Sequence, residues 1–224
     1  SDINFQLLDE IIRRVTKRRL DLFCEKEIFG PLKMTDTGYN PPAEKRNRVA
    51  PTTVKDGKAL QGIVHDPRAR KTEGVAGHAG LFTTAPDLAR YAKMLLQEGE
   101  LDGVRLFKPE TVKLMTTVQT PSALSVRRGL GWDIDTGYSS PRGLTDGTQF
   151  PLGSYGHTGF TGPSIWIDPY SQTFVIFLCN RVHPTENGPS IIPLRRTIGT
   201  LAAEAVKGFD FHNVPGALPA REGN

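Results

Sequence analysis

Several features typical of membrane, metal-binding or disulfide-stabilised proteins are missing from this sequence of 224 residues. It contains no run of about 18 apolar residues, so no segment is predicted to cross a membrane. The ligand spacings of common zinc and calcium sites are also absent, so we predict no bound metal. Only two cysteines occur, Cys24 and Cys179, and nothing in their spacing requires a disulfide. Cys179 ends an apolar run, which favours a buried free thiol.

A strong excess of one charge is likewise absent, because 28 basic and 24 acidic side chains give a net charge of +4. The basic residues form small groups within 13–19, 46–48 and 68–71, without the interleaved aromatic residues of a nucleic-acid platform. We therefore predict a solvated surface and no nucleic-acid partner. The apolar fraction of 38% is ordinary for a globular chain that is long enough to bury a core.

Helical patterns dominate the first half of the sequence. Helices are predicted over about 3–18 and 20–29, and the region 35–82 between them and the next helix is irregular and rich in charge. Thr84-Ala-Pro86-Asp87 combines a capping residue, a first-turn proline and an acidic residue, which predicts a helix to about residue 97. Pro109 is predicted to open a short helix to about residue 116. The apolar stripe predicted for the first helix consists of Leu8, Ile11, Ile12 and Val15.

Strand patterns dominate the second half. Strands are predicted over 130–135, 155–167 and 173–180, the last two joined by a short hairpin turn. Because 173–180 is apolar on both faces, we expect this strand to be central and covered. A final helix is predicted over 190–207. The apolar stripe predicted for it consists of Leu194, Ile198, Leu201, Ala202 and Ala205.

This order of elements predicts an α+β fold. We expect a mostly helical region with long loops over 1–125, antiparallel strands with a closing helix over 126–211, and a loose tail over 212–224. The sequence opens inside a helical pattern, without an initiator methionine or a signal sequence. We therefore expect the gene product to start further upstream.

Four segments together resemble one family of enzymes. They are GVAGHAGLFTTAPDLARYAKMLL, LGWDI, GHTGFTGPSIWIDP and FVIFLCNRVHPT. In combination they resemble the serine hydrolases related to class C β-lactamases, serine DD-peptidases and related esterases and amidases, and the resemblance extends from Ser1 to about Lys207. It implies a β-lactamase/transpeptidase-like fold, with an antiparallel sheet flanked by helices plus a helical region, which would be incomplete here.

The family uses three motifs: Ser-x-x-Lys with the nucleophile, Tyr-x-Asn with a proton-relay tyrosine, and Lys-Thr-Gly or His-Thr-Gly beside the cleft. His157-Thr158-Gly159 matches the third motif. The resemblance implies that these three residues bind substrate, with Thr158 donating or accepting a hydrogen bond and Gly159 allowing close approach. It also implies that the backbone N–H of Phe160 is one donor of the oxyanion hole.

The other two motifs depart from the family pattern. No Ser-x-x-Lys occurs, and the nearest form, Thr52-Thr53-Val54-Lys55, lies in a charged loop after the second motif. Ser1-Asp2 fits the end of a Tyr-Ser-Asp motif, which would place Asp2 at a catalytic position. Without the serine no acyl-enzyme can form, so we expect this chain to be inactive as it stands. We also expect a fragment to expose a sheet edge and apolar surface, with its own N-terminal segment as a partner.

Two histidines have both a structural and a functional interpretation. Taken alone, His157 favours a strand-end structural hydrogen bond, whereas its flanking match favours a place in the cleft. His78, in Gly77-His78-Ala79-Gly80, is either part of a tight turn or a substrate-lining residue. Histidine is mostly neutral at pH 7, so it anchors a carboxylate less well than lysine does. This favours peptidase, amidase or esterase chemistry over a typical β-lactamase.

The resemblance therefore implies the C-terminal part of a serine hydrolase that cleaves an amide or ester through an acyl-serine, without metal or other cofactor. A muropeptide derived from peptidoglycan or a D-amino-acid peptide is the favoured small-molecule substrate. The alternatives are a non-catalytic binding or regulatory domain that keeps the cleft, and a β-lactamase or small-ester esterase. Family habit favours the bacterial periplasm or the extracellular space.

Overall fold

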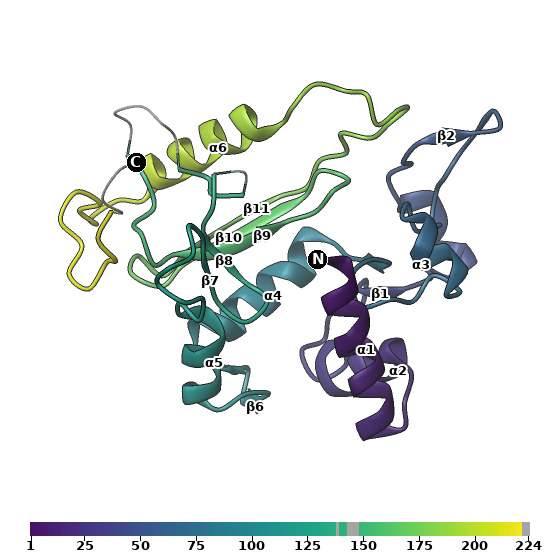
Figure 1. The fold of residues 1–224 in the computed structure, drawn as a ribbon, viewed down its shortest axis with the longest axis horizontal. Helices are drawn as coiled ribbons and strands as arrows, with labels where there is room; N and C mark the ends of the chain where they lie inside the picture. Colours follow the sequence, from purple (N-terminus) through teal and green to yellow (C-terminus); the bar gives the residue numbers. More distant parts are fainter. Residues whose placement is uncertain (138, 143–147, 221–224) are drawn as a thin grey trace. The chain divides into compact units, whose positions relative to one another are not determined.

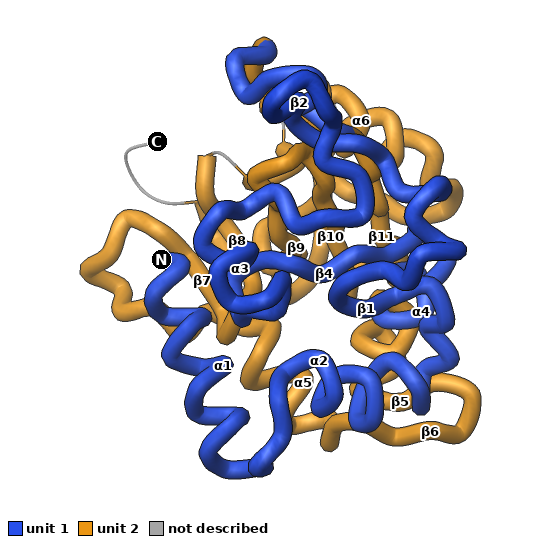
Figure 2. The backbone as a smooth tube through the Cα atoms, turned by 90° about the vertical axis from the view of Figure 1, so that its right-hand side faces the viewer, with its two compact units in different colours: residues 1–91, 180–188 blue, residues 92–179, 189–224 orange. Residues whose placement is uncertain are grey.

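The computed structural model describes residues 1–137, 139–142 and 148–220 of the chain. The chain divides into two compact units, coloured separately in Figure 2. Unit 1 contains residues 1–91 and 180–188, and unit 2 contains residues 92–179 and 189–224. A short segment that follows the last strand of unit 2 therefore belongs to unit 1.

Unit 1 begins with the two predicted helices. Helix α1 spans Asp2–Thr16, and the side chain of Ser1 caps it by accepting a hydrogen bond from the backbone N–H of Ile3 at 3.4 Å. Helix α2 spans Leu20–Cys24 and continues as a π-helical turn, η1, over Glu25–Phe29. The structure thus confirms both helices and the end of the second one before Gly30.

The inward face of α1 differs from the predicted stripe. Leu8 and Val15 are 52% and 77% exposed, whereas Phe5 and Ile12 are half-buried. The backbone of α1 approaches Gly77 so closely at Phe5 that a Cβ on this glycine would overlap the Phe5 carbonyl oxygen. This close approach places the Phe5 side of the helix inward and leaves much of the predicted stripe in solvent.

Short elements fill the region that the sequence predicts to be irregular. Two antiparallel pairs form there, β1 with β4 and β2 with β3. The returning segment of unit 1 is attached to this region, because the N–H of Val54 donates to the carbonyl of Pro184 at 2.9 Å and Nδ1 of His183 lies 2.8 Å from the carbonyl oxygen of Thr52. The elements are β1 (Gly38–Tyr39), the 3-10 helix η2 (Ala43–Arg48), β2 (Val54–Lys55), β3 (Lys58–Ala59), α3 (Pro67–Lys71) and β4 (Leu81–Phe82).

Helix α4 spans Ala85–Leu96, and the hydroxyl oxygen of Thr84 accepts a hydrogen bond from the N–H of Asp87 at 3.4 Å. The predicted helix start is therefore confirmed. The carboxylate of Asp87 accepts hydrogen bonds from the N–H of Asp36 at 2.8 Å and the hydroxyl of Thr37 at 2.7 Å, which ties the helix start to the loop before β1. After the hairpin of β5 (Glu100–Leu101) and β6 (Val104–Arg105), helix α5 spans Pro109–Thr116, as predicted.

Unit 2 is built on an antiparallel sheet with the strand order β11-β10-β9-β8-β7 (Figure 1). In the register of its central strands, Gly156 lies opposite Trp166, and Trp166 lies opposite Val175. Helix α6, Ile192–Ala205, covers this face, where Trp166, Phe150 and Ala203 form a buried cluster. The strands are β7 (Arg127–Arg128), β8 (Asp133–Asp135), β9 (Tyr155–Thr158), β10 (Ser164–Asp168) and β11 (Thr173–Phe177).

Two strand predictions need correction. The single strand predicted over 155–167 is two strands, β9 and β10, because the chain turns back at residues 159–163. The segment 173–180, predicted to be central, forms β11 at the edge of the sheet that the structure describes. Its five residues are half-buried, so the strand is not covered as predicted.

The buried face of α6 also differs from the prediction. Leu194 and Leu201 are 48% and 58% exposed, and the side of the helix that faces inward carries Arg195, Gly199 and Ala203. The small residues Gly199 and Ala203 let the helix backbone approach the rest of unit 2, since Gly199 lies against Pro141. Leu194 and Leu201 consequently lie on the exposed side of α6, whereas Ile198 is half-buried and Ala202 packs against the buried cluster.

Residues 212–220, where the sequence predicts a loose tail, are hydrogen-bonded to the rest of unit 2. The N–H of Leu218 donates to the carbonyl of Leu152 at 2.8 Å, and the hydroxyl of Tyr170 donates to the carbonyl of Gly216 at 3.0 Å. Of the helices formed by the described residues, none has both the length and the apolarity needed to span a membrane.

We expect Gly199→Ala to lower the free energy of unfolding by about 1–3 kcal/mol, because the added Cβ would lie 2.5 Å from Cβ of Pro141 and 2.6 Å from its carbonyl oxygen. On an open helix face the same change stabilises by about 1 kcal/mol. Leu201→Ala is the control and should change stability by less than about 0.5 kcal/mol. Urea denaturation of the three proteins measures this, and a stabilised Gly199→Ala variant would contradict the packing of α6.

Candidate functional site

The His-Thr-Gly motif lies where strand β9 ends and the chain turns into β10. His157 and Thr158 are the last two residues of β9, paired with Ile165 and Ser164 of β10. Gly159 follows outside the strand. The strand predicted over 155–167 would place the motif near its start, whereas in the structure the motif lies at the end of β9.

The turn over residues 159–163 is closed by backbone hydrogen bonds. The N–H of Gly159 donates to the carbonyl of Pro163 at 2.8 Å, and the N–H of Gly162 donates to the carbonyl of Gly159 at 3.1 Å. Gly162 has φ of 137°, a conformation that strongly favours glycine. Pro163 has no N–H, so it cannot extend the strand ladder in this direction. These residues explain why the predicted single strand is interrupted.

His157 is half-buried, and its Nδ1 lies 2.9 Å from the carbonyl oxygen of Thr158. A carbonyl oxygen can only accept, so Nδ1 carries the proton of this hydrogen bond. In the neutral ring the acceptor nitrogen is then Nε2. The structure therefore gives His157 the structural hydrogen bond of one interpretation, and the same bond leaves Nε2 of the neutral ring as a hydrogen-bond acceptor.

The surface of the turn is accessible to a ligand. Gly159 is exposed, Thr158 is half-buried, and the side chain of Phe160 is 61% exposed. A Cβ added at Gly159 would meet its nearest atom, Cδ of Pro163, at 3.5 Å, an ordinary contact distance. The fold itself therefore does not require a glycine at this position, which leaves the close approach of a ligand as a reason for it.

A buried carboxylate lies beside β9. Asp133 of β8 is paired with Gly156 and is fully buried. Its Oδ2 accepts a hydrogen bond from the hydroxyl of Thr136 at 2.6 Å. Burial raises the pKa of Asp133, and the Thr136 hydrogen bond and the charge of Arg128 oppose this rise without cancelling it. Nothing in the sequence marks Asp133 as buried, because an acidic residue in a short strand carries no signal of burial.

Asp2 and His78 lie in unit 1, and both contact the start of helix α3. Oδ2 of Asp2 lies 3.3 Å from the guanidinium of Arg68. The imidazole of His78 is 4% exposed, with Nε2 3.1 Å from Oδ1 of Asp66 and Nδ1 3.4 Å from Nε2 of Gln6. Asp66 caps α3 by accepting hydrogen bonds from two backbone N–H groups. These contacts favour the structural interpretation of His78, whose turn also holds Gly80 at φ of 112°.

The structure thus places the candidate residues in two groups. His157, Thr158, Gly159 and Phe160 are consecutive around one turn of unit 2, and Asp2 and His78 are connected through the first turn of α3 in unit 1. Thr52-Thr53-Val54-Lys55 runs into strand β2, whose two residues are exposed. An extended chain does not place residues three apart on one face, so this segment lacks the arrangement of a Ser-x-x-Lys helix. Among the described side chains, no group of three metal-ligating residues is found.

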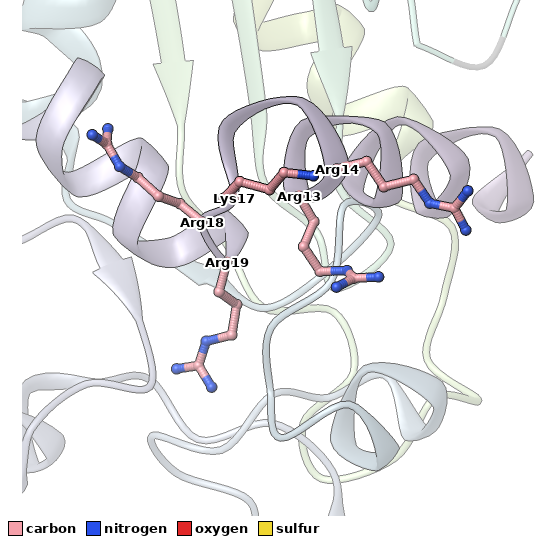
Figure 3. Close-up of a pocket in the computed structure, with 5 residues that line it drawn as sticks. All are labelled: Arg13, Arg14, Lys17, Arg18 and Arg19. Atoms are coloured by element: carbon pink, nitrogen blue, oxygen red, sulfur yellow. The ribbon is translucent and has the colours of Figure 1, made fainter.

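The largest basic group surrounds a hollow of about 500 Å³ at the end of α1 (Figure 3). Its side chains diverge from one another in Figure 3, whereas an anion site needs donors that converge. Glu10 binds two of the arginines, and Glu27 and Asp21 each bind another, at 2.6–2.7 Å. This supports the prediction of a solvated surface. The lining residues are Arg13, Arg14, Lys17, Arg18 and Arg19.

Known proteins resemble this chain over most of its length. Residues 1–199 match the family described as Beta-lactamase. The N-acetylmuramyl-L-alanine amidase of Bacillus subtilis strain 168 is 35% identical over 208 residues, which cover 84% of this chain and 46% of that protein. An Escherichia coli K12 protein named "Putative D-alanyl-D-alanine carboxypeptidase" is 33% identical over 210 residues, covering 86% of this chain and 47% of the relative. The chain thus spans about half the length of the curated relatives it matches.

A solved structure supports the fold. Unliganded simvastatin synthase from Aspergillus terreus superposes with a TM-score of 0.63 at 20% identity, over 91% of this chain and 53% of that one. At this identity the likeness concerns the fold alone. It confirms the expected α+β, β-lactamase-like architecture.

Gly156 and Gly159 differ in whether the fold has room for a side chain, and this difference can be measured. We expect Gly156→Ala to lower the free energy of unfolding by about 1–3 kcal/mol, because the new Cβ would overlap the carbonyl of Ile165 and the ring of Trp166. Gly159→Ala should change it by less than about 0.5 kcal/mol. Urea denaturation of both variants tests this, and a strongly destabilised Gly159→Ala would mean that the fold, not a ligand, needs this glycine.

A buried acid with a raised pKa makes stability depend on pH. Between the ordinary value of 3.8 and the raised value, the folded protein holds more protons at Asp133 than the unfolded chain, so this residue's contribution to stability falls as pH rises through that window. Asp133→Asn lacks this titrating group. We therefore expect the unfolding free energy of the variant, relative to that of the native protein, to increase as pH rises through the window. Urea titrations from pH 3.5 to 7 measure it, with the exposed Asp210→Asn as control. Parallel pH curves for Asp133→Asn and the native chain would contradict it.

Proposed function

The chain belongs to the beta-lactamase family, and we propose that it forms the substrate-binding part of a serine hydrolase that cleaves an amide or ester bond. The observation that carries this proposal is the turn after β9. It contains the consecutive residues His157, Thr158, Gly159 and Phe160, and backbone hydrogen bonds within residues 159–163 fix its conformation. Its relatives include proteins named as an amidase and a carboxypeptidase.

In the proposed reaction the lysine of Ser-x-x-Lys takes the proton of the serine hydroxyl, whose oxygen attacks the acyl carbon. The proton passes to the departing amine or alcohol, an acyl-serine forms, and water then hydrolyses it to release the acid and restore the serine. The N–H of Phe160 stabilises the negative oxygen of the tetrahedral intermediate. Thr158 orients the substrate through its hydroxyl, and His157 binds the substrate by accepting a hydrogen bond at Nε2. No Ser-x-x-Lys occurs in the sequence, so the nucleophile comes from polypeptide outside these 224 residues.

Two exposed apolar surfaces support such a completing segment. Helix α1 has no buried residue and exposes Leu8 and Val15. Strand β11 lies at the edge of the described sheet, and Leu178 directly after it is 43% exposed. Apolar surface and open strand edges of this kind are normally covered by further chain.

For the substrate we propose a peptidoglycan-derived muropeptide or a D-amino-acid peptide. The support is the curated relatives, whose names refer to N-acetylmuramyl-L-alanine and to D-alanyl-D-alanine. His157 stands where other members of the family carry lysine, so the motif itself lacks that permanently charged side chain.

A second candidate is a non-catalytic binding domain that keeps the cleft residues. The observation that favours it is the same absence of Ser-x-x-Lys from the sequence. The two functions differ in one property, which is whether any protein that contains this chain forms a covalent acyl-serine.

Labelling with a fluorescent penicillin and with a fluorophosphonate tests this property. We expect the purified 224-residue chain to remain unlabelled, because loss of a catalytic serine costs on the order of 10⁶-fold in rate in a related triad system. The gene product that includes any upstream Ser-x-x-Lys should label at that serine, and its Ser→Ala variant is the control. Labelling of the short chain would place the nucleophile within it, and absence of labelling in the longer protein would favour the binding domain.

A further inference from the structure

We propose that Arg195 is a positioning residue. It binds carbonyl oxygens of the turn 159–163 and thereby keeps the N–H of Phe160 in a constant direction. The catalytic part of this inference rests on the proposed function, in which that N–H stabilises the reacting oxygen. Nothing in the sequence motifs points to Arg195, which lies in helix α6, more than 30 residues after the turn.

The guanidinium of Arg195 contacts three carbonyl oxygens of this one turn. Nη2 donates to the carbonyl of Gly162 at 2.7 Å and lies 3.4 Å from the carbonyl oxygens of Gly159 and Pro163. The first is a short, charge-assisted hydrogen bond, and the other two are long. Arg195 is only 9% exposed, so its charge is largely withdrawn from water. Burying a guanidinium is costly unless it is well bonded. Nη2 obtains its bonds from backbone oxygens of the turn, whereas Nε makes no hydrogen bond among the described residues.

The bond geometry of the peptide links Arg195 to the N–H of Phe160. Gly159 and Phe160 share a trans peptide, in which the carbonyl and the N–H point in opposite directions. The Gly159 carbonyl faces Arg195 and also accepts the N–H of Gly162. The N–H of Phe160 is therefore directed away from Arg195. Any rotation of this peptide that releases the carbonyl also turns the N–H.

The turn needs this support because its backbone can adopt many conformations. Two of its five residues are glycines, which have the largest conformational entropy of any residue. The small residues Gly199 and Ala203 follow Arg195 at four-residue intervals on the buried face of α6. They bring the helix close enough for the arginine side chain to reach the turn, since Gly199 lies against Pro141.

A matched control lies next to Arg195 in the same helix. Arg196 donates from Nη2 to the carbonyl of Gly137 at 2.8 Å, outside the turn 159–163. Arg195→Met and Arg196→Met remove the same group from adjacent positions, and Arg195→Lys keeps the charge but loses the planar, forked donors. These three variants separate support of the turn from a general effect of removing an arginine from α6.

The first experiment measures amide hydrogen exchange in the purified 224-residue chain. We expect Arg195→Met to speed the exchange of the Gly159 and Gly162 amides by about tenfold or more, because hydrogen bonds to charged groups hold the turn closed. Arg195→Lys should give a smaller increase and Arg196→Met none. Amides of Trp166 and Ile167 report on the whole sheet and should be unchanged. Equal exchange at the turn in Arg195→Met and in the native chain would overturn the proposal.

If Arg195→Met exchanges faster throughout the sheet, the whole unit is destabilised, and the Arg195→Lys variant, which retains the charge, is used to test the proposal instead. Faster exchange in Arg195→Lys that is confined to the turn supports the proposal. Exchange at the turn of Arg195→Lys equal to that of the native chain overturns it. This experiment needs no enzymatic activity, so its result stands whether or not the chain belongs to an active hydrolase.

The second experiment concerns catalysis in the longer gene product that labels at serine. We expect Arg195→Met to lower kcat about 10²-fold with little change in KM, because a displaced oxyanion donor is lost mainly in the transition state. Arg195→Lys should recover part of kcat, and Arg196→Met should keep the native value. An unchanged kcat with a loosened turn would overturn the catalytic role of Arg195. If the native longer protein does not label, the proposed function fails and this catalytic role with it, whereas the exchange result still decides whether Arg195 holds the turn.

Discussion

The packing of Trp166 across Gly156 is the contact on which the arrangement of unit 2 depends. Gly156 has no side chain, and the indole of Trp166 fills the space above it. The ring is 3% exposed, and its N–H donates to the hydroxyl oxygen of Ser154 at 2.8 Å. Ala203 of α6 packs against the same ring. Because this one aromatic side chain contacts β9, β10 and α6, its size sets the packing distance between the helix and the sheet.

Polar groups are buried around this contact. Asp133, Ser154 and Asp168 are fully buried. Ser154 and Asp168 are hydrogen-bonded, whereas Asp133 accepts a hydrogen bond at Oδ2 and its Oδ1 has no partner among the described residues. Asp168 accepts hydrogen bonds from the N–H groups of Tyr170 and Ser171, which closes the hairpin between β10 and β11. Such groups cost stability relative to an apolar core and give a defined geometry to the strand ends. The candidate site lies at one of these ends.

The apolar surface of the chain is consistent with a role as part of a larger fold. The exposed residues of α1, the edge position of β11 and the exposed leucines of α6 are the places where the amphipathic pattern has no partner among the described residues. The curated relatives have about twice the length that the chain covers. The completing segment of the proposed function would supply the nucleophile and would also cover these surfaces.

The sequence alone determined the elements that depend on local chemistry. The cap at Thr84 and Pro109 at the start of α5 act on their immediate neighbours, so their effect can be predicted from the residues themselves. The motif His157-Thr158-Gly159 was also found from the sequence, with its family. What only the tertiary structure decided was which faces of α1 and α6 turn inward, that β11 is an edge strand, and that Arg195 reaches the turn after β9. Periodicity shows that a helix has an apolar face, but the partner that covers it comes from distant parts of the chain, and one close approach at a glycine can outweigh the long apolar side chains.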